Sequence, residues 1–185
     1  PLIATKNYLR DNAVKKISLF TNIEIVEEFN DYEITHKNPE AVIMGDIYKN
    51  FNWGILDQIF KLVYLDKATL IALHQNKYCI RDDKISLDLG PFVKAVEYAS
   101  DKKSILMGKP EKKFFDLAIK DIGENNEDIL MIGDDISSDI EGSIKANLKA
   151  IQVKTGKFQK KDLDNVIKPY IRIESIADLP KLLVM

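Results

Sequence analysis

Short apolar runs alternate along the chain with segments that have helical spacing. The runs lie at residues 16–20, 41–45, 69–73, 104–107, 129–132 and 150–153. Apolar runs of this length predict strands that are buried on both faces of a parallel sheet. Between them, apolar side chains recur every three or four residues, as in residues 53–63 and 114–122, which predicts amphipathic helices. Repeated strand–helix–strand units imply an α/β fold with a mostly parallel sheet and right-handed crossovers.

The remaining segments are predicted from shorter patterns. Helices are expected at residues 2–10, 23–29 and 92–99, and residues 31–38 are polar and irregular. Residues 77–89 form a loop or a hairpin, with Arg81–Lys84 as its turn. The chain is expected to finish with a strand at 170–173 and a helix at 176–183. No Pro/Gly-rich linker divides the sequence, so a domain boundary has to be argued from motifs.

Composition excludes several classes of protein. The 185 residues are long enough for one domain or two small ones, and a net charge of −2 gives no electrostatic support for nucleic-acid binding. The single cysteine, Cys79, excludes a disulfide framework and a multi-cysteine zinc site. No apolar run approaches the length of a membrane span, and no signal peptide opens the sequence. The sequence therefore predicts a cytoplasmic protein without membrane or nucleic-acid partners.

The stretch from Asp128 to Asp139 is the strongest functional signal. An apolar run enters Gly133, and the carboxylates Asp134, Asp135 and Asp139 follow. Ligands of open α/β sheets bind beyond the carboxyl ends of strands, and clustered carboxylates there suit Mg²⁺. The alternative is a structural role, in which Asp135 or Ser137 caps the next helix and Asp139 favours its positive end. One carboxylate would be enough for that role, so three favour a metal site.

Lys109 follows the apolar run at 104–107, within Gly108-Lys109-Pro110. Pro110 is expected at the first position of the next helix. Taken alone, Lys109 is an ordinary surface lysine. Taken with Asp134, it would bring a cation and a metal-binding carboxylate to one crevice, which is what phosphoryl transfer requires.

Three motifs resemble the later motifs of haloacid-dehalogenase (HAD) superfamily phosphatases. They are Met107–Lys112, Met131–Asp135 with Asp139, and Val153–Lys157. Residues 42–45, 70–74 and 90–99 are similar to the large α/β cap of the NagD-like branch of that superfamily. Within the branch, the chain looks similar to HAD-like hydrolase-domain proteins related to phospholysine phosphohistidine inorganic pyrophosphate phosphatase.

The resemblance implies a parallel Rossmann-like HAD core, incomplete here, with an inserted α/β cap domain. Residues 1–103 would be the cap, and residues 104–185 the C-terminal half of the core. The resemblance also implies roles for single residues. Lys109 would hold the substrate phosphate and the aspartyl-phosphate intermediate, and Asp134 would ligate Mg²⁺ directly. Asp139 and Asp135 would orient the metal's waters and Lys109, and Gly156 would shape a loop near the rim of the core. The cap loop at His74, Asn76 and Lys77 would reach the substrate, or it is an ordinary polar loop.

The family's reaction also needs a nucleophilic aspartate in an Asp-x-Asp motif after the first core strand, ahead of the cap. Asp162-Leu163-Asp164 has the right letters, but the basic residues 157–161 precede it, so it is interpreted as a helix start on the surface. Asp82 and Asp83 lie in a charged turn. The sequence therefore predicts a fragment whose core strands lack a central partner and would leave an apolar edge exposed. Either a separate N-terminal segment supplies the missing strand, or the core half is distorted or pairs with another chain.

The leading hypothesis is a Mg²⁺-dependent phosphatase as the parent protein, acting on a phosphomonoester, pyrophosphate or phosphoamide, with this chain inactive alone. The alternative is a non-catalytic HAD-fold binding or scaffold protein. A response-regulator receiver domain is set aside because its acidic pair precedes its lysine, whereas here Lys109 comes first. The expected partners are a small phosphorylated substrate and, by family analogy, a second copy bound through the cap.

Overall fold

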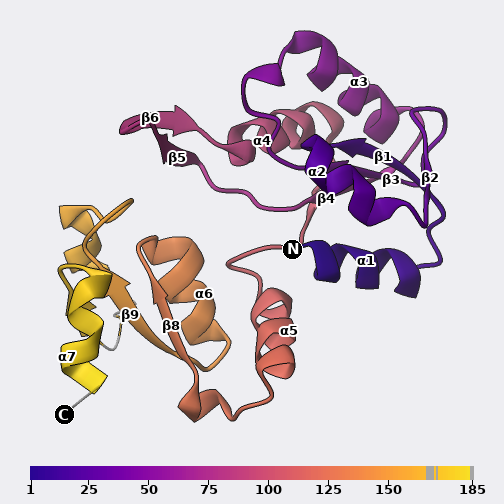
Figure 1. Ribbon diagram of the computed structural model, residues 1–185. Helices are drawn as coiled ribbons and strands as arrows, with labels where there is room; N and C mark the ends of the chain where they lie inside the picture. Colours follow the sequence, from indigo (N-terminus) through magenta and orange to yellow (C-terminus); the bar gives the residue numbers. More distant parts are fainter. Residues whose placement is uncertain (166–168, 170, 184–185) are drawn as a thin grey trace. The chain divides into compact units, whose positions relative to one another are not determined.

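The computed structural model describes residues 1–165, 169 and 171–183. The chain forms two compact units, which we call unit 1 (Pro1–Gly108) and unit 2 (Lys109–Met185). Each unit has its own parallel sheet (Figure 1). None of the helices in the described residues combines the length and apolar character needed to span a membrane.

Unit 1 is built on a five-stranded parallel sheet in the order β2-β1-β3-β4-β7. The strands are β1 (Lys16–Phe20), β2 (Glu33–Ile34), β3 (Ala41–Met44), β4 (Thr69–Ala72) and β7 (Ile105–Leu106). The helices are α1 (Leu2–Asp11), α2 (Ile23–Val26), η1 (Glu27–Phe29), η2 (Tyr48–Asn50), α3 (Trp53–Tyr64) and α4 (Leu89–Ser100). The predicted alternation of strands and helices in residues 1–108 is confirmed.

Alternate residues of the central strands face two separate cores. Val42 and Met44 of β3 pack with α3 and α4, whereas Ile43 packs with α1 and η1 on the other face. All three side chains are fully buried. A strand covered by helices on both sides has no polar face, which is why its sequence is a continuous apolar run.

A small antiparallel hairpin joins β4 to α4. It consists of β5 (Tyr78–Arg81) and β6 (Lys84–Leu87). Asp82 and Asp83 form its two-residue turn, and both have φ in the left-handed region, at 49° and 57°. Aspartate tolerates that region better than most residues, so the predicted charged turn is confirmed with a physical reason.

Unit 2 contains a three-stranded parallel sheet in the order β10-β9-β8. Its strands are β8 (Leu130–Gly133), β9 (Lys149–Val153) and β10 (Ile171–Ile173). Its helices are α5 (Lys112–Ile122), η3 (Asn126–Asp128), η4 (Ile136–Glu141), α6 (Gly142–Lys145), η5 (Lys160–Asp164), η6 (Ile176–Asp178) and α7 (Leu179–Leu183). Met131 packs with α5 and Ile132 packs with α7, so helices cover both faces of this sheet as well.

Several details differ from the sequence expectations. The strand before Lys109, predicted to belong with residues 104–185, is β7 and pairs with β4 in unit 1. The two compact units divide between Gly108 and Lys109. The assignment of residues 1–103 to a cap and of residues 104–185 to half of a core stays a prediction. Pro110 is not the first helical residue, because α5 begins at Lys112 after Glu111, and the Lys109–Pro110 peptide bond is cis.

The acidic strand is also less buried than predicted. Residues 130–133 of β8 are half-buried, because β8 pairs only with β9 among the described residues. Tyr170, predicted to start the last strand, lies outside the described residues.

Candidate active site

The acidic stretch forms a tight turn at the carboxyl end of β8. Asp134 and Asp135 follow Gly133 directly, and η4 then begins as a π-helix. The amide of Ile140 donates to the Asp135 carbonyl over 3.3 Å, which is the wide spacing of a π-turn. The Asp139 amide donates to the same carbonyl at 2.9 Å, so Asp135 accepts hydrogen bonds from two successive amides. π-turns of this kind are frequent at functional sites.

Asp139 and Lys109 form the central ion pair of this turn. Lys109 Nζ lies 2.7 Å from Asp139 Oδ1, and the Asp139 side chain is only 6% exposed. The other carboxylate oxygen, Oδ2, accepts a hydrogen bond from the Asp135 amide at 3.2 Å. Asp139 is thus held by the Asp135 amide on one side and by Lys109 on the other. It fixes the position of the Lys109 ammonium group, whose side chain is 39% exposed.

Gly133 is required by this geometry. A Cβ placed on Gly133 would lie 2.5 Å from Asp139 Cβ and 2.6 Å from Asp139 Cγ, and closer still to Oδ2. Side chains essentially never approach that closely. The glycine expected from the sequence as a turn residue is therefore needed because the Asp139 carboxylate fills the space that a side chain would occupy.

Asp135 caps η4. Its Oδ1 accepts hydrogen bonds from the amides of Ser137 (3.0 Å) and Ser138 (3.1 Å), and its Oδ2 lies 3.3 Å from Lys157 Nζ. Burial alone would raise the pKa of Asp135, but the Ser138 hydrogen bond, the Lys157 charge and the Ser137 hydrogen bond outweigh burial and lower the pKa below its ordinary value. Asp135 thus makes the capping contacts that we considered for it, and its predicted role beside a metal stays a prediction.

Asp134 is held by the loop that follows β9. Its Oδ2 accepts a hydrogen bond from the Lys157 amide at 2.6 Å. A carboxylate has two oxygens, so this contact leaves Oδ1 for another ligand. Asp134 is half-buried at the carboxyl end of β8, where the sequence predicts the metal ligand.

The three carboxylates do not converge on one point. Asp139 faces Lys109, Asp135 faces the start of η4, and Asp134 faces the Lys157 amide. Within residues 1–165, 169 and 171–183, no three His, Cys, Asp or Glu side chains are grouped so that they could hold a metal ion. The metal roles predicted for Asp134 as a direct ligand, and for Asp139 and Asp135 beside it, stay predictions.

A single carboxylate of this kind still fits Mg²⁺. That ion keeps several waters and is commonly bound through one or two carboxylates together with substrate phosphates. The oxygen of Asp134 that the turn leaves unused is a hard donor of the type that Mg²⁺ prefers. The donor set therefore fits an ion that completes its coordination with water and phosphate.

The predicted cap residues His74, Asn76 and Lys77 lie in unit 1, after β4. His74 Nδ1 is 3.7 Å from Asp88 Oδ1, and the Asn76 carbonyl accepts a hydrogen bond from the Gly90 amide at 2.9 Å. These contacts fix the loop to the start of α4. They are the contacts of an ordinary polar loop, and the role of the three residues in substrate binding stays a prediction.

Sequence reasoning missed two features of unit 2. Lys157 contacts both Asp134 and Asp135, although the sequence singled out only Gly156 and its neighbours as a loop. Asp162 was expected on the surface, but it is 5% exposed. Its carboxylate accepts hydrogen bonds from the Gln159 amide (3.0 Å) and from Gln152 Nε2 (3.3 Å). The predicted helix start is present, since η5 begins at Lys160, but Asp162 is buried in a polar network and is not exposed.

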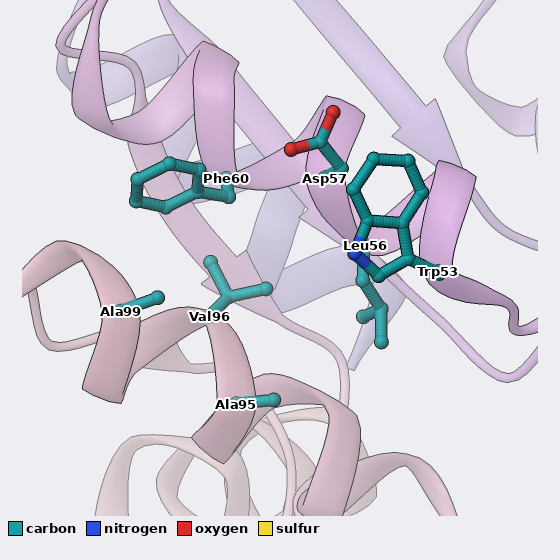
Figure 2. A pocket seen from close by; sticks show the side chains of 7 residues that line it. All are labelled: Trp53, Leu56, Asp57, Phe60, Ala95, Val96 and Ala99. Atoms are coloured by element: carbon teal, nitrogen blue, oxygen red, sulfur yellow. The ribbon is translucent and has the colours of Figure 1, made fainter.

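Unit 1 also carries a shallow open groove of about 190 Å³ between α3 and α4 (Figure 2). It is lined by Trp53, Leu56, Asp57, Phe60, Ala95, Val96 and Ala99. None of the predicted site residues lines it. Trp53 is 79% exposed at its edge, so the groove is an apolar surface feature and has no cluster of catalytic groups.

The fold and the turn after β8 define a HAD-like hydrolase, and the chain belongs to that family. Residues 106–179 match the family described as HAD-hydrolase-like. The chain is 38% identical to haloacid dehalogenase-like hydrolase domain-containing protein 2 of Bos taurus, over 94% of this chain and 66% of the bovine protein. It is 37% identical to phospholysine phosphohistidine inorganic pyrophosphate phosphatase of Xenopus laevis, over 78% of this chain and 53% of that protein. The chain thus spans about two thirds or less of the length of these relatives.

Solved structures agree on the fold. The 4-nitrophenylphosphatase of Thermotoga maritima matches with a TM-score of 0.85 and 24% identity, over 97% of this chain and 69% of that chain. NagD of E. coli K-12 matches with a TM-score of 0.81 and 24% identity, over 96% and 70%. The predicted fold class, an α/β parallel core with a cap of the NagD-like branch, is confirmed.

Proposed function

We propose that this chain carries the C-terminal catalytic half of a Mg²⁺-dependent phosphatase for small phosphorylated compounds. The Lys109–Asp139 ion pair is the main support for the proposal. It holds the ammonium group of Lys109 against the turn that also contains Asp134. A phosphoryl group in transfer spreads negative charge over its oxygens, and a fixed lysine and a divalent cation are what neutralise that charge. Phosphomonoesters, pyrophosphate and phosphoamides all fit this chemistry, and the names of the relatives include phosphatases.

The residues have separate roles in this proposal. Lys109 holds the phosphate, and Asp139 keeps Lys109 in place and is not itself a metal ligand. Asp134 holds Mg²⁺, which when bound supplies positive charge to the phosphoryl oxygens. Asp135 supports the turn by capping η4. His74, Asn76 and Lys77 of the cap contribute to substrate choice.

The nucleophile is proposed to come from outside these 185 residues. Of the two carboxylates in the Asp162-Leu163-Asp164 sequence, Asp162 is buried and hydrogen-bonded to Gln152 and Gln159, where it cannot attack a phosphate. The relatives are longer than the part that this chain matches, which is consistent with a separate segment bearing the Asp-x-Asp pair. We therefore expect this chain to have no turnover when it is alone.

An assay with p-nitrophenyl phosphate and Mg²⁺ tests the proposal. The 185-residue chain is compared with the longest protein that its gene encodes. We expect activity only in the longer protein, with a loss of at least about a hundredfold in Lys109→Ala and in Asp134→Asn, because each removes charge that stabilises the transition state. Lys120→Ala, which alters a lysine in the last turn of α5, is the control and should keep full activity.

Absence of activity in every form, with retained binding of phosphate compounds, would favour the alternative of a non-catalytic HAD-fold binding or scaffold protein. Activity that survives both Lys109→Ala and Asp134→Asn would refute the proposed site.

We also propose a cytoplasmic location and a homodimer formed through residues 1–103. The single cysteine is consistent with a reducing compartment. The groove between α3 and α4 leaves apolar side chains uncovered, as interaction surfaces do. Light scattering of the chain should give the mass of a dimer, and a monomer at all concentrations would contradict this part.

A further inference from the structure

The loop that follows β9 contains a tight turn at Thr155–Phe158. The Phe158 amide donates to the Thr155 carbonyl over 3.2 Å, which closes a four-residue turn. Gly156 is its first central residue and has φ of +59°, whereas the second, Lys157, has no positive φ. These signs fit a type II′ turn, which favours glycine at its first central position.

The peptide between these two central residues meets Asp134. The Lys157 amide donates to Asp134 Oδ2 at 2.6 Å, and Lys157 Nζ reaches Asp135 Oδ2 at 3.3 Å. The backbone and the side chain of one residue therefore contact two successive carboxylates of the acidic turn. Hydrogen bonds to a carboxylate are among the stronger ones in proteins, so the contact limits the orientations that Asp134 can adopt.

Gly156 is required for two independent reasons. Its φ lies in the left-handed region, which side chains disfavour. A Cβ at this position would also lie 3.0 Å from Asp134 Cγ and would collide with Asp134 Oδ2. The second reason belongs to the contact with Asp134 and would not apply to a left-handed turn elsewhere in the chain.

From this geometry we infer that the Gly156–Lys157 turn is the positioning element for Asp134. The Lys157 amide binds one oxygen of the carboxylate and so directs the other toward a divalent cation. This rests on the proposed function, in which Asp134 holds Mg²⁺. Groups that hydrogen-bond to metal ligands commonly change metal affinity by about tenfold to a hundredfold when they are altered. Gly156 and Lys157 are positioning residues in this sense, because both act through Asp134.

Gly123 provides a matched control. It ends α5 with φ of +78°, and a Cβ built on it meets no atom within 4 Å. Gly123→Ala therefore also places a side chain on a residue with positive φ in the same unit, but it does not disturb Asp134. Any difference in metal affinity between the two variants reports the contact with Asp134, because a loss of stability alone affects both.

The experiment is a Mg²⁺ titration of the 185-residue chain, followed by the amide resonances in NMR spectra and by the melting temperature. We expect the wild type to bind Mg²⁺ and Asp134→Ala to lose binding. Gly156→Ala should bind about tenfold more weakly or worse. Gly123→Ala should bind like the wild type, although both alanine variants melt at a lower temperature.

If Gly156→Ala and Gly123→Ala bind Mg²⁺ with equal affinity and Asp134→Ala does not bind it, this inference is overturned and the proposed function is left intact. Absence of Mg²⁺ binding by the wild type would overturn both.

A second measurement covers the case in which Gly156→Ala does not fold. The Lys157 amide proton of the wild type should resonate far downfield, should move in Asp134→Ala, and should respond to Mg²⁺. An amide resonance that is the same in the wild type and in Asp134→Ala would overturn the inference.

Discussion

Gly133 is the residue on which the geometry of the acidic turn depends most directly. Gly133→Ala would place a methyl group against the Asp139 carboxylate, 2.5 Å from Asp139 Cβ. We expect a loss of stability of about 1–3 kcal/mol, as is usual for overpacking, because Asp139 is held by Lys109 and by the Asp135 amide and cannot move without breaking them. Urea denaturation of the wild type and the variant measures this loss.

Gly54→Ala is the control for this substitution. Gly54 lies inside α3, where a Cβ would meet only Asn52 Oδ1, at 3.3 Å. Alanine should be neutral there or stabilise the helix by about 0.5–1 kcal/mol. If both variants lose stability equally, the space beside Asp139 is not the reason for glycine at residue 133.

The single-residue chemistry was predictable only in part. The order of an apolar run, Gly133 and three carboxylates identified the turn, and Lys109 forms an ion pair with Asp139 of that turn. The sequence could not tell which oxygen of each carboxylate would be used by the chain itself. Asp135 and Asp139 are engaged by an amide or an ammonium group, and those contacts depend on how η4 folds. The contact from Lys157 joins residues far apart in sequence, so no local pattern reports it.

At the scale of elements, the connection from α4 to β7 depends on Glu97. Its Oε1 accepts hydrogen bonds from the amide and hydroxyl of Ser104, at 2.9 and 2.6 Å, and its Oε2 lies 2.5 Å from Lys94 Nζ. Burial alone would raise the pKa of Glu97, but the contacts with Lys94 and Ser104 outweigh burial and lower the pKa. Glu97 therefore ties the end of α4 to the strand that leads to Lys109.

A lowered pKa in the folded state means that Glu97 contributes stability above its unfolded pKa, near 4.5, and loses that contribution as the pH falls through the folded value. Glu97→Gln should cost about 1–2 kcal/mol at neutral pH, because a charged acceptor is lost, and the difference from the wild type should shrink below about pH 4. Thermal melts between pH 3 and 8 measure this. Glu24→Gln, at an exposed position of α2, is the control and should show little difference at any pH. A cost for Glu97→Gln that does not vary with pH would contradict the assignment.

Helices and strands with a clear apolar pattern were predictable from the sequence. Those that form only through pairing or hydrogen bonding with distant residues were not. β1 and α3 have the expected positions because their apolar patterns are long and clear. β2 was missed because its two residues are exposed and carry no pattern, and only pairing with β1 makes them a strand. The predicted helix after Gly133 is divided into the π-turn η4 and the short α6, and no local pattern in the sequence indicates that division.

At the scale of the whole molecule, the sheet to which residues 104–107 belong could not be predicted from the sequence. The run at residues 104–107 precedes Lys109, and the sequence therefore assigned it to the same half. In the structure this run forms β7, which pairs with β4, a strand more distant in the sequence. Sheet membership is set by tertiary pairing, which a single apolar run does not encode.

The two units should differ in stability. β3 lies between β1 and β4, and its residues are fully buried, whereas β8 pairs only with β9 among the described residues and is half-buried. Local opening is easier where few apolar contacts cover a strand. We expect the amides of β3 to exchange with solvent deuterium about tenfold more slowly, or slower still, than those of β8. Exchange followed by mass spectrometry measures both strands in one sample. Equal protection of the two strands would mean that units 1 and 2 open as one cooperative body, and the separate packing of their cores would then have no consequence for unfolding.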